Sequence, residues 1–291
     1  MAKPIAFATD AEWPQLTPDD QLAQAALAQL GVEAAPALWD AQLDWAQFQA
    51  VFIRSTWDYH VRPDEFTAWL ARLEALQVPV WNPPAVIGWN MNKAYLVELE
   101  RKGVRIVPSV WIEQGDTPSF QDVAGERSSP RLVLKPLVSA NAYNTWVIEN
   151  EADWQEKLAA IHKDSAAVAQ EFMPEVQSEG EWSLLFFDGE FSHAVLKTPK
   201  AGDFRTQMNY GAVSRLASPD AALVAQARAV LDAVEPVLYA RVDGVVRGGQ
   251  LYLMELELIE PHLFLEYGPG APQRFARAVQ SRLEVVRHAA A

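Results

Sequence analysis

Residues 239–265 read YARVDGVVRGGQLYLMELELIEPHLFL, two apolar runs on either side of a glycine pair. Charged residues occupy alternate positions in both runs: Arg241 and Asp243, then Glu255 and Glu257. Because successive side chains of a strand point to opposite faces of the sheet, each pair projects to one side. The stretch predicts a β-hairpin that can gather three carboxylates and one arginine on a single surface.

The length of the hairpin loop decides which carboxylates share a face. A two-residue turn at the glycine pair would put Asp243 opposite Met254, whereas a three-residue loop over 248–250 pairs Asp243 with Glu255. We predict the three-residue loop, because only it gathers the carboxylates and because such loops with a left-handed glycine are common. The alternative is a half-exposed antiparallel sheet whose charges are simply solvated.

Carboxylates crowded on one surface repel one another unless a cation lies among them. The usual cation of an all-oxygen site is Mg²⁺, commonly with a nucleotide phosphate among its ligands, although Mn²⁺ also suits oxygen donors. The sequence therefore predicts Asp243, Glu255 and Glu257 as metal ligands.

The composition excludes several classes of protein. The chain has 291 residues, enough for about two domains. Lys and Arg total 24 against 38 for Asp and Glu, a net charge of −14. Such an acidic chain without a basic run is not expected to bind nucleic acid or an anionic membrane. Without any cysteine, a disulfide scaffold and thiol chemistry are excluded. We expect a cytoplasmic protein, because no long apolar segment is present.

The order of the elements predicts an N-terminal α/β domain. Apolar runs alternate with amphipathic or alanine-rich segments through the first eighty residues, as parallel sheets require. The expected strands are 5–8, 32–38, 50–53 and 78–81, and the expected helices are 19–30 and 63–76. Farther along, Asp188-Gly189 between two apolar runs predicts a second hairpin and an antiparallel sheet. Residues 108–130 are rich in turn formers and show no clear pattern.

Two lysines lie where phosphate ligands are expected. Lys93 begins a helix, where it adds to the partial positive charge of the helix end. Lys135 ends a short strand and precedes a loop of small and amide residues, 139–145, whose backbone N–H groups can face an anion. Each lysine taken singly reads as a solvated surface residue, so the interpretation depends on their convergence with the acidic hairpin.

A candidate substrate segment follows the third expected strand. Arg54, Ser55, Trp57, Asp58 and Tyr59 lie at the carboxyl end of that strand, where open α/β sheets bind ligands. Arg54 can pair with a substrate carboxylate and Asp58 with an amine, while the aromatic rings form a wall. The alternative is that Arg54 makes a structural ion pair and the rings fill the core.

Several short motifs together carry a resemblance to a known family. They are Asn92-Lys93, Val133-Leu134-Lys135-Pro136, Gln170-Glu171-Phe172, Arg241-x-Asp243 and Glu255-x-Glu257. Further features are 53–59, Gly180-Glu181-Trp182-Ser183, 191–195, 202–205 and 254–261. In this order and spacing the chain resembles the ATP-grasp ligases over most of its length. Within them it is most similar to the branch that includes O-ureido-serine cyclo-ligase and, more distantly, glutathione synthetase.

The resemblance implies a three-part ATP-grasp fold of α/β and α+β type. An N-terminal α/β domain would span 1–87, a linker helix and small lid subdomain 88–172, and a C-terminal antiparallel-sheet subdomain 173–291. The implied activity is an ATP- and Mg²⁺-dependent ligase that phosphorylates an oxygen of a small amino-acid-like substrate and then forms a C–N bond or ring. A peptide ligase of the glutathione-synthetase kind and an inactive nucleotide-binding protein are the alternatives, and a homo-oligomer is compatible with either.

The resemblance also implies a role for each matched residue. Phosphate contacts would come from Lys93, Lys135 and Ser139, adenine and ribose contacts from Glu171, Phe172 and Glu179, and catalytic cations from Arg241 and Arg205, with Lys197 on the substrate side. Three departures from the family pattern are visible. Glu257 replaces a frequent asparagine, the loop 139–145 lacks glycine, and Tyr210-Gly211-Ala212 replaces a Gly-Gly pair. The two histidines near these segments, His60 and His193, read as structural.

Overall fold

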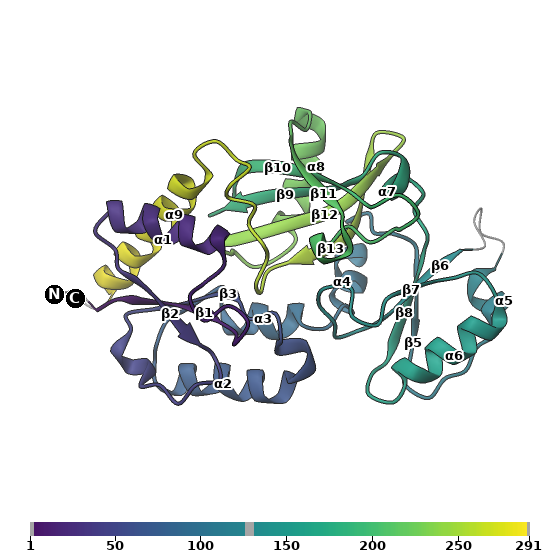
Figure 1. Cartoon of the computed structure of the whole chain (residues 1–291), viewed down its shortest axis with the longest axis horizontal. Helices are drawn as coiled ribbons and strands as arrows, with labels where there is room; N and C mark the ends of the chain where they lie inside the picture. Colours follow the sequence, from purple (N-terminus) through teal and green to yellow (C-terminus); the bar gives the residue numbers. More distant parts are fainter. Residues whose placement is uncertain (1–2, 126–130, 290–291) are drawn as a thin grey trace.

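The computed structural model describes residues 3–125 and 131–289, which form three sheets. The N-terminal sheet and the lid sheet lie at opposite ends of the long axis, and the largest sheet lies between them (Figure 1). In the described part of the chain, no helix is long and apolar enough to cross a membrane.

The N-terminal sheet is parallel, as the alternating pattern predicts. Its strand order is β2-β1-β3-β4, and it comprises β1 (Ile5–Thr9), β2 (Ala34–Leu38), β3 (Val51–Ser55) and β4 (Val80–Trp81). Helices α1 (Pro18–Gln29) and α2 (Pro63–Ala75) connect the strands, and short 3₁₀ turns η1 (Trp45–Gln47) and η2 (Tyr59–Val61) flank β3. Thr17 caps α1 by accepting a hydrogen bond from the backbone of Asp20.

The lid is a four-stranded sheet with helices on one side. Its order is β5-β8-β6-β7, from β5 (Ser109–Ile112), β6 (Leu132–Pro136), β7 (Trp146–Ile148) and β8 (Ala167–Glu171), with α5 (Phe120–Ala124) and α6 (Glu151–Ile161). The expectation of an irregular segment from 108 was wrong, because β5 gains its structure by pairing with β8 and α5 by a capping box at Ser119. Residues 126–130 of that segment lie outside the described part.

The central sheet is antiparallel, in the order β11-β10-β9-β12-β13. Its strands are β9 (Glu181–Phe187), β10 (Glu190–Thr198), β11 (Val213–Ala217), β12 (Tyr239–Arg247) and β13 (Gln250–Glu257), with α7 (Glu175–Ser178), η3 (Met208–Tyr210) and α8 (Ala221–Asp232) around it. The predicted Asp188-Gly189 hairpin is confirmed, since Phe187 pairs with Glu190.

The β12–β13 register has the predicted outcome by a different route. Asp243 pairs with Glu255, but Arg247 pairs with Gln250, so the loop holds two residues rather than the three that we predicted. Both turn glycines have positive φ, 60° and 74°, which a two-residue turn of this hand requires. The register shifts beyond Asp243 because Met254 is an extra residue in β13, a β-bulge.

Packing crosses the boundaries of the three parts. The C-terminal helix α9 (Ala271–Ala289) packs beside α1 at the N-terminal end of the molecule, and the two chain ends lie side by side there (Figure 1). Its Phe275 meets Phe7 of β1 with ring centroids 6.4 Å apart. In the linker, α3 (Pro84–Asn90) and α4 (Tyr95–Arg101) share a core with the central sheet.

Candidate active site

A cavity of about 480 Å³ lies where the three parts of the molecule meet. The N-terminal domain contributes Trp57 and Tyr59, the lid contributes Lys135, and the central sheet contributes Arg241 and Asp243. The remaining predicted residues that line the cavity are Lys93, Ser139, Glu171, Phe172, Lys197, Arg205, Glu255 and Glu257. The structure thus brings together most of the predicted site, from segments that are far apart in the sequence.

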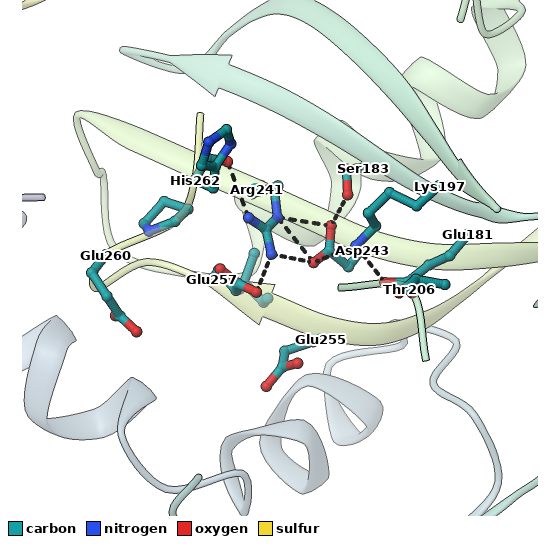
Figure 2. A network of polar contacts seen from close by, with 12 residues as sticks. Glu181, Ser183, Lys197, Thr206, Arg241, Asp243, Glu255, Glu257, Glu260 and His262 are labelled. Carbon is teal, nitrogen blue, oxygen red and sulfur yellow. Dashed lines mark hydrogen bonds and ion pairs between the residues drawn. The ribbon is translucent and has the colours of Figure 1, made fainter. Parts of the chain in front are cut away.

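Arg241 holds the acidic hairpin together from within. Its guanidinium donates to both Asp243 oxygens at 3.1 and 3.0 Å, to Glu257 and to the His262 carbonyl oxygen at 3.0 Å. Figure 2 shows Asp243 and Glu257 turned toward this guanidinium, while Glu255 has no dashed contact to it. Burial opposes ionisation of Asp243, but Arg241 and Lys197 outweigh it, so the pKa of Asp243 lies below its ordinary value.

Neighbouring strands add a second cation to this network. Lys197 on β10 pairs across the sheet with Glu181 on β9, with Nζ 2.9 Å from Glu181 Oε1 and 3.6 Å from Asp243 Oδ2. Ser183 donates to Asp243 at 2.5 Å, and Thr206 donates to Glu181 (Figure 2). Glu181 was not predicted as a site residue. It lies two positions before Ser183 on β9 and therefore on the same face of the sheet as Ser183 and Asp243.

The two predicted phosphate lysines meet at the third carboxylate. Lys93 Nζ lies 3.1 Å from Glu255 Oε1 and donates to the carbonyl and hydroxyl of Ser139 at 2.6 and 3.1 Å. Burial opposes ionisation of Glu255, but Lys93 and Lys135 lower its pKa overall. Burial also lowers the pKa of Lys135 to about 8. These lysines are therefore buried cations of the cavity rather than solvated surface residues.

The glycine-poor loop 139–145 reaches a tight geometry without glycine. Asn141, Ala142 and Asn144 have φ of 51°, 55° and 50°, in the left-handed region that glycine usually occupies. Asparagine tolerates this conformation because its short side chain bonds locally, whereas alanine is strained there. Ser139, Asn141 and Ala142 line the cavity, so the loop covers the site despite its composition.

The expected adenine side of the cavity is already ordered by internal bonds. The Glu171 carboxylate accepts from Arg247 at 2.9 Å, and the Phe172 N–H donates to the Arg131 carbonyl oxygen at 3.1 Å. The Arg131 guanidinium also stacks on the Phe172 ring, 3.9 Å from its centroid. Glu179 does not line the cavity: it is exposed at the end of α7.

Arg205 lies on the cavity wall in a paired state. It donates to Asp203 from Nε at 3.1 Å and from the second guanidinium nitrogen at 2.8 Å, and its guanidinium carbon lies 3.8 Å from the Tyr210 ring centroid. Tyr210 belongs to the segment that departs from the family pattern, and in this structure it serves as the stacking surface for Arg205.

The three predicted metal ligands share one side of the hairpin but do not form a ready metal cage. Across the described residues, no three His, Asp or Glu side chains are grouped closely enough to hold a metal ion. The reason is that Arg241 engages Asp243 and Glu257, while Lys93 engages Glu255. As donors, three carboxylates fit a hard divalent cation. The Arg241 and Lys93 side chains that pair with them show that this buried surface requires positive charge.

Three of the five predicted substrate residues within 54–59 do not line the cavity. Arg54 is 1% exposed, donates to Asp20 at 2.8 Å and to the Pro261 carbonyl oxygen at 2.9 Å, and does not line the cavity. Ser55 likewise donates to Asp20, at 3.1 Å. The interpretation of Arg54 as a direct carboxylate ligand was wrong, because its guanidinium is committed to a buried ion pair with Asp20. The structural ion pair was the correct alternative.

Asp58 is the third of these residues, whereas the two aromatic residues line the cavity. Asp58 accepts from Trp39 Nε1 at 2.7 Å and from Arg62, so its predicted role as an amine ligand is not supported by its position. Trp57 and Tyr59 do line the cavity. Trp57 Nε1 donates to the Glu260 carbonyl oxygen at 3.0 Å, which fixes the segment after β13 against the N-terminal domain.

Both histidines that were expected to be structural are bonded within the fold. His193 Nε2 lies 3.0 Å from the carbonyl oxygens of Leu263 and Phe264, and burial lowers its pKa to about 4. His60 Nδ1 lies 2.8 Å from the Trp57 carbonyl oxygen. Cavity residues without a predicted role include Trp13, Asp19, Glu260 and His262.

Two family models match the chain. The model of the D-cycloserine synthetase DcsG N-terminal domain matches residues 5–82, and that of the prokaryotic glutathione synthetase ATP-grasp domain matches residues 108–260. The second match covers the lid, all five strands of the central sheet and all the predicted nucleotide and metal residues except Lys93.

Among curated proteins, the chain is similar to the cycloserine biosynthesis protein DcsG of Streptomyces lavendulae. The two are 29% identical over 277 residues, which cover 88% of this chain and 90% of that protein. A glutathione synthetase of Parasynechococcus marenigrum is 26% identical over 196 residues, covering 65% of this chain and 53% of that protein.

Solved structures agree with these matches. The crystal structure of D-cycloserine synthetase DcsG superposes with a TM-score of 0.86 at 26% identity, covering 96% of this chain and 99% of that one. A D-alanine–D-alanine ligase from Bacillus anthracis in complex with ATP gives a TM-score of 0.72 at 17% identity with full coverage of both chains, a likeness of fold.

Proposed function

Because the chain belongs to the ATP-grasp family, we propose that it is a ligase that uses the cavity to transfer a phosphoryl group from ATP to an oxygen of a small amino-acid-like substrate. A nitrogen nucleophile then attacks the activated carbon, a C–N bond forms and phosphate leaves. Ring closure within one substrate, as expected of a relative of a cycloserine-forming protein, and joining of two substrates both fit this chemistry.

One observation supports the proposal most strongly. Cations from three separate segments, Lys93, Lys135 and Arg241, converge on the carboxylates of one hairpin inside a cavity large enough for a nucleotide and a small substrate. Phosphoryl transfer needs placed charges rather than covalent help from the protein. A cavity with buried positive and negative groups of this kind matches that requirement.

The chain's own residues have separable roles in this proposal. Lys93 and Lys135 would bind phosphate oxygens, with Ser139 holding Lys93 in place. Asp243, Glu255 and Glu257 would hold Mg²⁺ or Mn²⁺, which neutralises phosphate charge when bound. Arg241 and Lys197 lie beside these carboxylates, where they can stabilise the negative charge of the transferred group. Peptide ligation of the glutathione-synthetase kind would use the same residues with two separate substrates.

The function is tested by incubating the protein with ATP, Mg²⁺ and a panel of amino acids and their derivatives. ADP release is measured, and the products are identified by mass spectrometry. We expect at least one panel member to raise ADP release and to give a product that has lost water relative to its precursors. The Glu255→Gln variant should lose this activity, and Glu33→Gln, an exposed carboxylate outside the cavity, should keep it. ATP binding without turnover for any panel member would favour an inactive nucleotide-binding protein.

A further inference from the structure

The end of the cavity formed by the N-terminal domain has a charge pattern of its own. We define the acidic end as the cavity-lining residues within 12–19, 57–59 and 259–266. Its described members include four carboxylates and five aromatic side chains but no lysine or arginine. The lysines and arginines that line the cavity come from other segments: Lys93, Lys135, Lys197, Arg205 and Arg241.

Glu260 is the most unusual residue of this acidic end. It is 8% exposed and lies on the cavity wall, and no other described residue donates a hydrogen bond to its carboxylate. Figure 2 shows the side chain apart from the Arg241 guanidinium, without a dashed contact. Burial, together with the charges of Glu257 and Glu255, raises the pKa of Glu260 well above its ordinary value. Its own backbone N–H bonds the carboxylate, but no cation of the described chain does. A buried carboxylate without a cationic partner is costly, which indicates a counter-charge that arrives with a ligand.

Aromatic rings line the same end of the cavity as Glu260, and one of them holds its backbone. Trp57 anchors the Glu260 backbone and stacks on His262, with ring centroids 6.4 Å apart and planes at 23°. Trp13 packs edge-on against Trp57 at 6.3 Å. Burial lowers the pKa of His262 to about 4, so that ring is neutral and adds no positive charge. Aromatic faces attract cations, most strongly where water is excluded.

A second carboxylate of the acidic end is also incompletely paired. Asp19 accepts from the Leu265 N–H at 2.6 Å through one oxygen, while its other oxygen, Oδ2, is buried without a hydrogen-bond partner. Arg241 adjoins this region through its bond to the His262 carbonyl oxygen, but its guanidinium is already engaged by Asp243 and Glu257. Arg54 also lies near this end, but Asp20 and the Pro261 carbonyl oxygen engage its guanidinium. Among the described residues, no cation therefore pairs with Asp19 Oδ2 or with the Glu260 carboxylate.

We propose that Glu260 binds the protonated amine of the substrate, with the acidic end selecting substrates that carry a free amine. The inference depends on the proposed ligase function and adds the orientation of the substrate to it. With its amine at Glu260, a small substrate presents its other end toward Arg241 and Lys197, where the phosphoryl group is transferred. A substrate whose amine is blocked loses this contact. A substrate with an extra negative charge is repelled by the carboxylates of the acidic end.

Kinetics with paired probes test this assignment. The panel member that gives the largest ADP release is compared with its N-acetyl derivative, in the wild type, Glu260→Gln, Glu260→Asp and the Glu33→Gln control. We expect the free-amine probe to be the better substrate, and Glu260→Gln to raise its KM by roughly ten- to hundredfold, the effect of losing one charge-assisted hydrogen bond. The KM for ATP should stay unchanged, and Glu260→Asp should restore part of the loss.

Glu260→Gln is not expected to disrupt the fold, because no neighbouring side chain depends on the charge, and its melting temperature reports on this directly. An unchanged KM for the free-amine probe in Glu260→Gln, or equal turnover of the N-acetyl probe by the wild type, would overturn the assignment and leave the ligase function standing. Failure of every panel member to raise ADP release by the wild type, with ATP still bound, would overturn both.

Discussion

Asp243 and Glu255 face each other across β12 and β13, although the turn between these strands holds an even number of residues. Their pairing depends on the extra residue at Met254, which shifts the register by one position and turns Glu255 and Glu257 to the face of Asp243. Opposite the bulge lies Gly244, where an added Cβ would stand 2.4 Å from the Tyr252 carbonyl oxygen. Gly244 therefore permits the close backbone approach on which the acidic surface depends.

Substitution of Gly244 should disturb both stability and the site. A Cβ at this position meets backbone, which cannot rotate away, so Gly244→Ala should lower the free energy of unfolding by about 1–3 kcal/mol, as overpacking does. ADP release should fall further than stability alone explains, because the bulge sets the face of Glu255. Chemical denaturation and ADP assays measure the two effects.

Gly248→Asn is the matched control for this variant. Gly248 also belongs to the hairpin, but an added Cβ there meets nothing within 4 Å, and asparagine tolerates its φ of 60°. We expect near-normal stability and activity. Equal tolerance of Gly244→Ala would show that the register does not depend on a glycine at the bulge.

The hairpin also shows how far the sequence leads. Alternation in 241–243 and 255–257 predicts the acidic face, and the Gly248-Gly249 pair predicts a turn. The bulge could not be predicted, because a pattern of charges is satisfied either by a longer loop or by an extra residue within the strand. The only trace of it in the sequence is Gly244 in the middle of an apolar strand, a position where glycine often marks a bulge or a close backbone approach.

The buried pair of Arg54 and Asp20 gives a second prediction. Both side chains are almost fully buried, so Arg54→Met leaves the Asp20 carboxylate without its counter-charge. Loss of one partner of a buried ion pair costs about 3–5 kcal/mol, and thermal or chemical unfolding should show a decrease of that order. A loss of substrate affinity with unchanged stability would instead restore Arg54 as a substrate ligand.

Arg62→Met provides the comparison on the same segment. Arg62 pairs with Asp40 at 2.9 Å and with Asp58, but about a third of each of these side chains is exposed. Exposed ion pairs contribute roughly 0–1 kcal/mol. The loss of stability should therefore be much smaller than for Arg54→Met, which separates the effect of burial from the effect of charge.

The loop 139–145 gives a third prediction. Ala142 has φ of 55°, a conformation that costs an L-residue with a Cβ roughly 1–2 kcal/mol relative to glycine. Ala142→Gly should relieve this strain and lower the KM for ATP several-fold if the loop covers the nucleotide as proposed. Ala140→Gly, in the same loop but outside the left-handed region, should bring no such gain.

The substrate end could be predicted only in outline. Trp57 and Tyr59, which follow β3, line the cavity as expected, because parallel strands bind ligands at their carboxyl ends. Arg54 is withheld from the cavity because Asp20 engages it, and Asp20 lies 34 residues earlier in the chain. Glu260 lies only three residues beyond Glu257, but its lack of a partner is a property of the folded neighbours, which no local pattern reveals.

The pKa of Lys135 gives the last prediction. Burial lowers this pKa from the ordinary 10.5 to about 8. Below pH 8 the lysine is charged in both states, and burial of that charge destabilises the folded state. The folded state binds fewer protons than the unfolded state between pH 8 and 10.5, and this group's contribution to stability therefore rises with pH across that window. Lys135→Met removes the cost of burying the charge, and we expect it to raise the free energy of unfolding at pH 7 by up to roughly 3 kcal/mol. This gain shrinks toward pH 10.5.

The Lys135→Met variant should also bind ATP more weakly, and the ATP affinity of the wild type should fall as pH rises through about 8. Urea denaturation and ATP titration at pH 7, 8.5 and 10 measure both trends, with Lys163→Met, an exposed lysine of the lid, as the control. Destabilisation by Lys135→Met at pH 7 would show that the lysine stabilises the empty site rather than being held there for the phosphates.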